Sequence, residues 1–249
     1  KSINQEESNI RITLICTSSD YVSAISKDII TEISNFEWDE IVFYNDGERY
    51  VESLECVDIR SEFRDNSKLI HGGKYVITGG SGGIGYHLAK KLINDISCEV
   101  LLVGRTPYNE MTADKAKNIN ELLELNDKVS YISADISTEA GIDIIKNAIE
   151  SKWNSKFDGI FHLAGVGTFS DEYDSEKHFF RDESIETFNE YFAPKVKGTC
   201  NLVNLLEKDT LFVVFGSINA YFGGTGYSAY SGANSFISKY VDSLIEQGY

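Results

Sequence analysis

The chain has 249 residues, enough for one large domain or for one domain and part of another. Hydrophobic residues make up 42% and charged residues 25%, a globular composition that excludes a collagen-like or disordered chain. The net charge of -16 opposes non-specific binding to nucleic acid or anionic lipid, and no apolar run reaches the roughly 18 residues of a membrane span. We therefore expect a cytoplasmic protein. The widely spaced Cys16, Cys56, Cys98 and Cys200 predict reduced thiols, with no disulfide and no metal site.

The beginning of the chain predicts a small module of strands and one helix. Residues 9–16 are β-branched and apolar enough for a strand, and apolar side chains at helical spacing predict a helix over 20–33. Two strand-like runs within 40–57 surround Asn45-Asp46-Gly47. This turn sequence predicts a β-hairpin, because glycine adopts a positive φ without steric cost.

A polar stretch without periodicity, residues 58–73, separates this module from the rest and sets the expected domain boundary between residues 71 and 72. Short apolar runs then alternate with amphipathic ones. The expected strands cover 74–80, 98–104, 128–134, 158–165 and 210–216, and the expected helices cover 84–94, 113–125, 138–151, 185–206 and 230–247. Five βα units in succession predict an α/β fold with a Rossmann-like, doubly wound parallel sheet.

The segment TGGSGGIG lies between the first of these strands and its helix. Glycine lets the backbone turn sharply and approach a pyrophosphate, and a helix start offers unpaired N–H groups. A tight turn that binds nothing is the alternative. The order of strand, loop and helix favours a dinucleotide site formed by Thr78, Gly79, Gly80, Ser81, Gly82, Gly83, Ile84 and Gly85, with Gly79, Gly83 and Gly85 as the main candidates.

The ends of the next strands carry further candidates for cofactor binding. Arg105 can pair with a 2'-phosphate through its fork of donors, which favours NADPH over NADH; a solvated arginine is the alternative. Asp135 could accept a hydrogen bond from an adenine amino group or, equally, serve the start of the next helix. We expect His162 to be a packed, satisfied imidazole rather than a general base. The other candidates are Gly104, Ile136, Ala164 and Gly165.

A group of polar residues follows the last predicted strand. Ser217 comes directly after it, Tyr230 stands at the start of the next helix, and Asn234 lies one turn further on the same face. A hydroxyl cap and a packed aromatic ring are the alternative roles of Ser217 and Tyr230. Their position at the end of the strand makes these three residues candidates for catalysis.

From about Gly72 to its end, the chain resembles the ketoreductase domains of modular polyketide synthases, a branch of the short-chain dehydrogenase/reductase superfamily. The matching segments are TGGSGGIG, LLVGR, ADIS, HLAG and PKVKGTCNL. Ordinary members of the superfamily carry lysine where Asn234 stands; here the lysine is Lys195 in PKVKG, the exchange typical of the polyketide-synthase branch. Residues 1–71 resemble the end of the truncated, non-catalytic Rossmann-like structural subdomain that precedes such ketoreductases.

This resemblance implies NADPH-dependent reduction of a β-ketoacyl, or an α-ketoacyl, thioester carried by an acyl carrier protein. Tyr230 would donate the proton. Lys195 would lower the pKa of Tyr230 and reach the nicotinamide ribose, Ser217 would hydrogen-bond the carbonyl oxygen, and Asn234 would position Lys195 or a water. The partners implied are the acyl carrier protein and neighbouring polyketide synthase domains.

The chain departs from the family pattern in two places. Residues 167–169 (GTF) stand where the LDD motif would fall, and Phe222 stands where the tryptophan of the opposite stereochemical class would fall; we favour the class without LDD. The sequence stops at Tyr249, before the superfamily's last strands and lid. We therefore expect a fragment of a longer polypeptide, or a chain completed by another segment, with the strand at 210–216 as an apolar edge.

Two other functions stay open. A reductase-like scaffold or docking module would bind cofactor weakly or not at all, as the missing carboxyl-terminal part suggests. A free-standing short-chain dehydrogenase would act on a small carbonyl compound. The asparagine at position 234 and the N-terminal module disfavour this last alternative.

Overall fold

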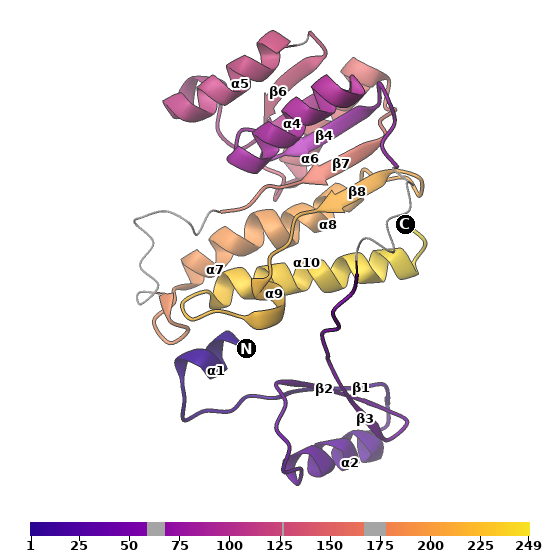
Figure 1. Ribbon diagram of the computed structural model, residues 1–249, viewed down its shortest axis with the longest axis vertical. Helices are drawn as coiled ribbons and strands as arrows, with labels where there is room; N and C mark the ends of the chain where they lie inside the picture. The colour runs from indigo at the N-terminus through magenta and orange to yellow at the C-terminus, as the bar shows by residue number, and fades with distance from the viewer. Residues whose placement is uncertain (59–67, 126, 167–177) are drawn as a thin grey trace. The chain divides into compact units, whose positions relative to one another are not determined.

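The computed structural model describes residues 1–58, 68–125, 127–166 and 178–249 (Figure 1). It divides into two compact units, Lys1–Asn66 and Ser67–Tyr249. The division falls inside the polar stretch 58–73. None of the helices in the described ranges combines the length and the hydropathy that crossing a bilayer requires.

The smaller unit is a three-stranded sheet with a helix on one face. Its elements are α1 (Ser2–Glu6), β1 (Leu14–Thr17), α2 (Val22–Ile33), β2 (Ile41–Asn45) and β3 (Glu48–Val51). β1 and β2 are parallel, and β3 pairs antiparallel with β2. The predicted hairpin is confirmed, and Asp46 and Gly47 both have the positive φ that a type I′ turn requires, 51° and 81°.

β1 covers only the second half of the strand predicted over 9–16. The cause is the side chain of Asn4, in a short helix that the sequence does not predict. Its Oδ1 accepts from the Ile12 nitrogen at 2.8 Å, and its Nδ2 donates to the Ile12 oxygen at 3.0 Å. Because these backbone groups are already paired, this segment needs no partner strand.

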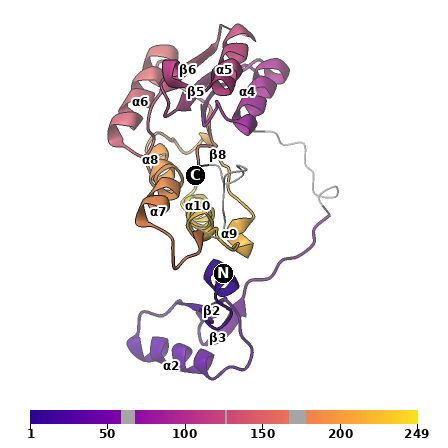
Figure 2. The ribbon, with the colours of Figure 1, turned by 90° about the vertical axis from the view of Figure 1, so that its left-hand side faces the viewer.

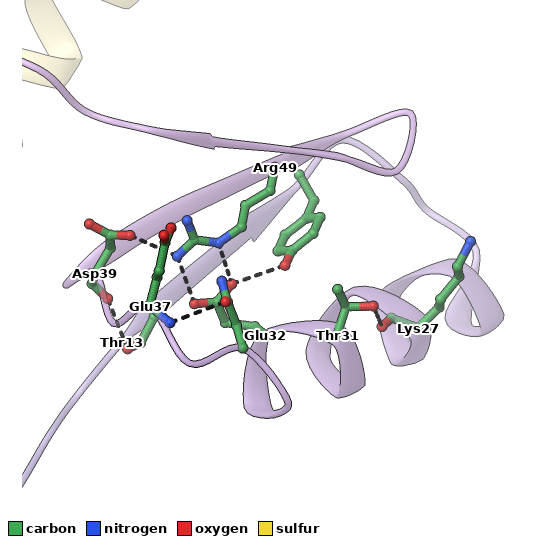
Figure 3. A network of polar contacts seen from close by, with 9 residues as sticks. Thr13, Lys27, Thr31, Glu32, Glu37, Asp39 and Arg49 are labelled. Carbon is green, nitrogen blue, oxygen red and sulfur yellow. Dashed lines mark hydrogen bonds and ion pairs between the residues drawn. The ribbon is translucent and has the colours of Figure 1, made fainter.

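A buried ion pair joins the helix of the smaller unit to its sheet (Figure 3). Arg49 in β3 donates from Nε to Glu32 Oε2 at 2.8 Å and from Nη2 to Glu32 Oε1 at 3.0 Å, and it also reaches Asp39 at 2.8 Å. The Tyr44 hydroxyl donates to the same Glu32 carboxylate at 2.9 Å. The hydrogen bonds from Arg49, more than that from Tyr44, hold the pKa of Glu32 below its usual value, against the effect of burial.

The larger unit contains a five-stranded parallel sheet in the order β6-β5-β4-β7-β8. Its strands are β4 (Lys74–Thr78), β5 (Glu99–Gly104), β6 (Val129–Ser133), β7 (Gly159–His162) and β8 (Leu211–Val214). The strand order reverses between β4 and β7, so the sheet is doubly wound, as predicted. In such sheets ligands bind beyond the carboxyl ends of the strands at the reversal.

Helices cover both faces of this sheet. α4 (Gly83–Ile96) and α5 (Ala113–Leu125) lie on one side, and α6 (Glu139–Trp153), α7 (Ile185–Phe192), α8 (Gly198–Val203) and α10 (Ser228–Glu246) lie on the other (Figure 1). Ile77 belongs to the core beneath α4 and α5, whereas its neighbour Val76 belongs to the core beneath α6 and α8. Each side chain is fully buried, a contribution of about 1.5–3 kcal/mol.

The helix predicted over 185–206 is confirmed from Ile185 to Val203, but it contains a π-helical segment and ends three residues early. α7 ends at Phe192, a π-helical segment called η3 (Ala193–Lys197) follows, and α8 ends at Val203. Pro194 lies at the start of the π-helical segment; it has no N–H for the α-helical ladder, and its ring would clash with the carbonyl of the preceding turn. The short α9 (Asn219–Phe222) and η1 (Tyr108–Glu110) are not predicted from the sequence either.

Candidate active site

The loop after β4 turns sharply and leaves the start of α4 open. Gly79 has a φ of 75°, and a Cβ at this position would lie 2.9 Å from the Ala164 nitrogen. A Cβ on Gly85 would overlap the Gly79 carbonyl, whereas one on Gly83 would meet nothing within 4 Å. None of the described side chains caps α4. The first N–H groups of the helix are therefore available to an anion that approaches past Gly83.

A cavity of about 170 Å³ lies beside this loop, where the strand order reverses. It brings together residues from the ends of four strands. The sequence candidates that line it are Thr78, Gly79, Gly104, Arg105, Asp135, Ile136, Ala164 and Gly165. The remaining candidates, Gly80, Ser81, Gly82, Gly83, Ile84 and Gly85, lie in the loop and the start of α4 rather than in the cavity wall.

Two cationic side chains line the same cavity, Arg105 directly after β5 and Lys115 in the first turn of α5. The side chains of Arg105 and Lys115 are exposed, and neither forms an ion pair or hydrogen bond with any residue that the structure describes. Sequence reasoning missed Lys115. It could have been found, because it lies in the first turn of the helix predicted over 113–125, which follows a strand ending at this edge. The pair offers an anion two positive charges from different elements.

Asp135 shapes the turn before α6. Its Oδ1 accepts from the Ser137 nitrogen at 2.9 Å and from the Ser137 hydroxyl at 2.7 Å. The N-cap of α6 is Thr138, whose hydroxyl accepts from the Gly141 nitrogen at 3.0 Å. Asp135 therefore stabilises the turn before α6 but is not its N-cap; the residue also lines the cavity, and its contact with adenine stays a prediction.

His162 ends β7 and is completely buried, as predicted. Its Nδ1 lies 2.7 Å from the Thr78 hydroxyl, but its Nε2 has no hydrogen bond within the described part of the chain, so the expectation of a fully satisfied ring is only half met. Burial first, and the nearby charge of Lys195 second, lower the pKa of His162 to about 3. The ring is therefore neutral at physiological pH.

Lys195, in η3, extends toward the ends of β7 and β8. Its side chain passes over Gly165, where a Cβ would lie 2.9 Å from Lys195 Cε, and its ammonium donates to the Phe215 carbonyl at 2.6 Å. The residue is only 7% exposed, and burial lowers its pKa from 10.5 to about 8. This is a largely desolvated ammonium with one hydrogen bond, so it has donors left for a further partner.

Ser217 follows β8, and Tyr230 and Asn234 lie one turn apart on α10. Ser217 Oγ accepts from the Asn219 nitrogen at 3.2 Å, and Tyr230 packs in a cluster that includes Tyr191 and, beside Lys195, Val196. Figure 2 shows α10, which carries Tyr230 and Asn234, nearly end-on beside α7 and α8. Tyr230 and Lys195, both in the described part of the chain, make no hydrogen bond to each other.

Asn234 is fully buried on α10. Its Nδ2 donates to the Tyr230 carbonyl at 2.8 Å, whereas its Oδ1 has no partner among the described residues. An unsatisfied buried carbonyl oxygen costs about 1–3 kcal/mol. Such an atom is an acceptor available to an ammonium or a hydroxyl group.

Two other regions bear on the site. Residues 167–169, on which the stereochemical expectation partly rests, lie outside the described residues, and Phe222 lies 51% exposed at the end of α9. A larger cavity, of about 720 Å³, is lined by parts of β8, the segment before it and the end of α10. It contains none of the candidate residues, so its size does not make it the functional site.

Comparison with known proteins identifies the family of this chain. The model of the KR domain family matches residues 73–249. Polyketide synthase PksM of Bacillus subtilis is 34% identical over 206 residues, which cover 82% of this chain and 4% of that protein. Erythronolide synthase EryA3 of Saccharopolyspora erythraea is 29% identical over 176 residues, 71% of this chain and 5% of that one. The chain thus spans a small part of these relatives.

Solved structures show the same likeness. A ketoreductase domain from the bacillaene assembly line is 25% identical with a TM-score of 0.77, over 99% of this chain and 57% of that one. A structure containing adenylation, ketoreductase and pseudo-Asub domains of a keto acid-selecting module gives a TM-score of 0.83 at 25% identity, over 96% of this chain and 20% of that one.

Proposed function

The chain belongs to the KR family, the ketoreductase domains of polyketide synthases, and we propose that it uses NADPH to reduce a ketoacyl thioester to the hydroxyacyl thioester. The family is nicotinamide-dinucleotide dependent. The observation that carries the proposal is the buried ammonium of Lys195, held between the end of β7 and the end of β8 with donors to spare. An inactive protein with the same fold would gain nothing from burying this charge, because desolvating an ammonium costs free energy of folding.

The residues of the crevice fit a dinucleotide. The uncapped start of α4 and the open space at Gly83 suit a pyrophosphate. Arg105 and Lys115 suit the 2'-phosphate that distinguishes NADPH from NADH, because neither has a competing partner among the described residues. When bound, the cofactor supplies the hydride that reaches the carbonyl carbon.

The protein supplies the proton that the reduction of the carbonyl group requires. Tyr230 transfers its phenolic proton to the carbonyl oxygen of the substrate, and the ammonium of Lys195 stabilises the phenolate that remains. The Lys195 ammonium, which donates to the Phe215 carbonyl, would use its remaining donors to hold the cofactor ribose and to act on Tyr230. The unpaired Oδ1 of Asn234 can accept from this ammonium or from a water, which would position both groups.

Ser217 donates a hydrogen bond to the carbonyl oxygen of the substrate. Its Oγ accepts from the Asn219 backbone, so its own hydrogen is free to be donated toward the oxygen on which negative charge develops. A donor placed in this way can contribute roughly 3 kcal/mol to a transition state. We propose a β-ketoacyl or an α-ketoacyl chain on an acyl carrier protein as the substrate, with neighbouring synthase domains as partners.

The test is the loss of NADPH absorbance with a ketoacyl thioester. The wild-type chain should turn over, and Tyr230→Phe, which removes only the hydroxyl, should lower kcat at least about 100-fold, the scale of general acid catalysis. No turnover by a folded chain that binds NADPH would contradict the proposal. Equal turnover by Tyr230→Phe would remove Tyr230 from the mechanism.

One observation favours a second candidate, a scaffold without activity. The Lys195 ammonium is hydrogen-bonded to the Phe215 carbonyl and not to Tyr230. A titration with NADPH separates the two functions. A folded chain that does not bind NADPH favours the scaffold, and binding followed by turnover favours the reductase.

A further inference from the structure

The segment after β5, which carries Arg105, is hydrogen-bonded to side chains of β6. Ser133 Oγ donates to the Arg105 carbonyl at 2.9 Å, and the Tyr131 hydroxyl donates to the Thr106 carbonyl at 2.7 Å. Because β5 ends at Gly104, both bonds lie beyond the strand. Two hydroxyl groups of β6 therefore hold the two residues that follow β5, where the backbone would otherwise need other partners.

The ring of Tyr131 reaches this segment across Gly104. A Cβ on Gly104 would lie 2.6 Å from the Tyr131 oxygen, so a larger residue there would displace the hydroxyl. The Tyr131 side chain packs against the core beneath α4 and α5, and burial raises the pKa of its hydroxyl, which therefore stays protonated and can donate. The glycine at position 104 thus makes room for the hydrogen bond to Thr106.

Arg105 is held at its backbone, whereas its guanidinium is available. The side chain is exposed, lines the cavity where the strand order reverses, and makes no ion pair or hydrogen bond with the described residues. Tyr131 and Ser133 are not among the residues that line this cavity. A ligand in the cavity would therefore meet the guanidinium and not the two hydroxyls. A segment that is ordered before binding lowers the entropic cost of association.

We propose that Tyr131 and Ser133 are positioning residues that hold the backbone of Arg105 and so direct its guanidinium to the 2'-phosphate of NADPH. The hold on the backbone stands on the two hydrogen bonds alone. Its consequence for NADPH rests on the proposed function, which takes Arg105 as a partner of that phosphate. The two hydroxyls should therefore strengthen the binding of NADPH and hardly affect NADH, which lacks the phosphate.

A small set of variants of the full chain removes or keeps the hydroxyls. Tyr131→Phe and Ser133→Ala each remove one, and Ser133→Thr keeps the second. Ser130→Ala is the matched control, because side chains alternate along a strand and the buried Ser130 Oγ has no partner among the described residues. Circular dichroism and thermal unfolding verify that each variant folds.

Cleavage by trypsin after Arg105 measures the hold on the backbone without any ligand. Peptide mass spectrometry after mild digestion compares it with cleavage after Arg181, an exposed arginine elsewhere in the larger unit. Proteolysis of a folded chain follows the population of locally open states. We expect Tyr131→Phe and Ser133→Ala each to raise this ratio about fivefold, the effect of losing one hydrogen bond, and Ser133→Thr and Ser130→Ala to stay within about twofold of the wild type.

Fluorescence titration with the two dinucleotides gives the second readout. Tyr131→Phe and Ser133→Ala should each weaken NADPH about fivefold and NADH less than about twofold. Added to Arg105→Ala, the same changes should have no further effect on NADPH, because the side chain that they position is gone. A variant that weakens both dinucleotides alike, or that still weakens NADPH in the absence of the Arg105 side chain, would overturn the positioning role.

An unchanged cleavage ratio in folded Tyr131→Phe and Ser133→Ala would overturn the hold on the backbone. If Tyr131→Phe does not fold, Ser133→Ala decides the question, with Ser133→Thr as the rescue. A wild-type chain that binds neither dinucleotide refutes the proposed function, and the cleavage ratio after Arg105 still decides whether the two hydroxyls hold this segment.

Discussion

The side chain of Lys195 carries a positive charge although it is buried. Burial lowers its pKa from 10.5 to about 8, so between these values the unfolded chain binds a proton that the folded chain does not. The free energy of unfolding therefore rises with pH across this window. Below pH 8 the folded protein carries the full cost of the desolvated ammonium.

Replacing this charge should stabilise the protein while it removes the activity. We expect Lys195→Met to raise the free energy of unfolding at pH 7 by roughly 2 kcal/mol, after discounting the lost hydrogen bond to Phe215. The gain should shrink as the pH rises from 8 toward 10.5. Urea unfolding at pH 7 and pH 10 measures both values. A variant less stable than the wild type at pH 7 would show that burial of the ammonium does not destabilise the folded protein.

Arg105 and Lys115 should decide between the two dinucleotides. Arg105→Ala and Lys115→Ala should each weaken NADPH about tenfold and NADH less than about twofold, because only NADPH carries the 2'-phosphate. Fluorescence titration with both cofactors measures this. Lys117→Ala, an exposed lysine on the same helix, is the control. Equal losses for NADPH and NADH would remove the phosphate assignment.

Single residues were predictable where chain order places them at a strand end. Arg105, Asp135 and Gly165 are such cases, and all three line the cavity. The contacts of Lys195 with Phe215 and of His162 with Thr78 were not predictable. They depend on which strands are neighbours in the sheet, and sequence spacing does not carry that information.

Among the elements, α2 and β3 depend on one ion pair. Glu32 is nearly buried and accepts two hydrogen bonds from Arg49 and one from Tyr44. Glu32→Gln keeps the shape but loses the charge, and we expect it to cost the smaller unit about 2 kcal/mol. Hydrogen exchange of the β2 and β3 amides in the full chain measures this locally.

The pH dependence of the same pair has a defined sign. The pKa of Glu32 is lowered in the folded state, so its contribution is complete above the ordinary value of 4.5 and is lost as the pH falls below it. Exchange in the wild type and in Glu32→Gln should therefore converge at acid pH. Glu37→Gln, an exposed neighbour, should change nothing. A gap that stays constant down to pH 3 would show that the charge of Glu32 is not responsible.

Elements with clear periodicity were predicted best. The helix at Ala113–Leu125 and the five strands of the larger unit follow from their apolar patterns. The π-helical segment η3 was not predicted, because the apolar period continues through Pro194 although the α-helical hydrogen-bond ladder does not. α1 and α9 are too short for a periodic signal.

On the scale of the whole molecule, the alternation of strands and helices was enough to predict a doubly wound sheet, and the strand order places the crevice between β4 and β7. The assignment of Lys195 and Asn234 came from resemblance to a family, since spacing alone gives no reason to exchange their positions. The chain spans only 4% of PksM, so the carrier-bound substrate and the neighbouring domains stay proposals.

Transfer of deuterium from NADPH labelled at the reactive C4 position to the carbonyl carbon of a ketoacyl thioester tests the central claim most directly. Mass spectrometry of the product should show a hydroxyacyl thioester one mass unit heavier with the wild-type chain, and almost none with Tyr230→Phe. A folded wild-type chain that binds the labelled cofactor and yields no labelled alcohol would contradict the account.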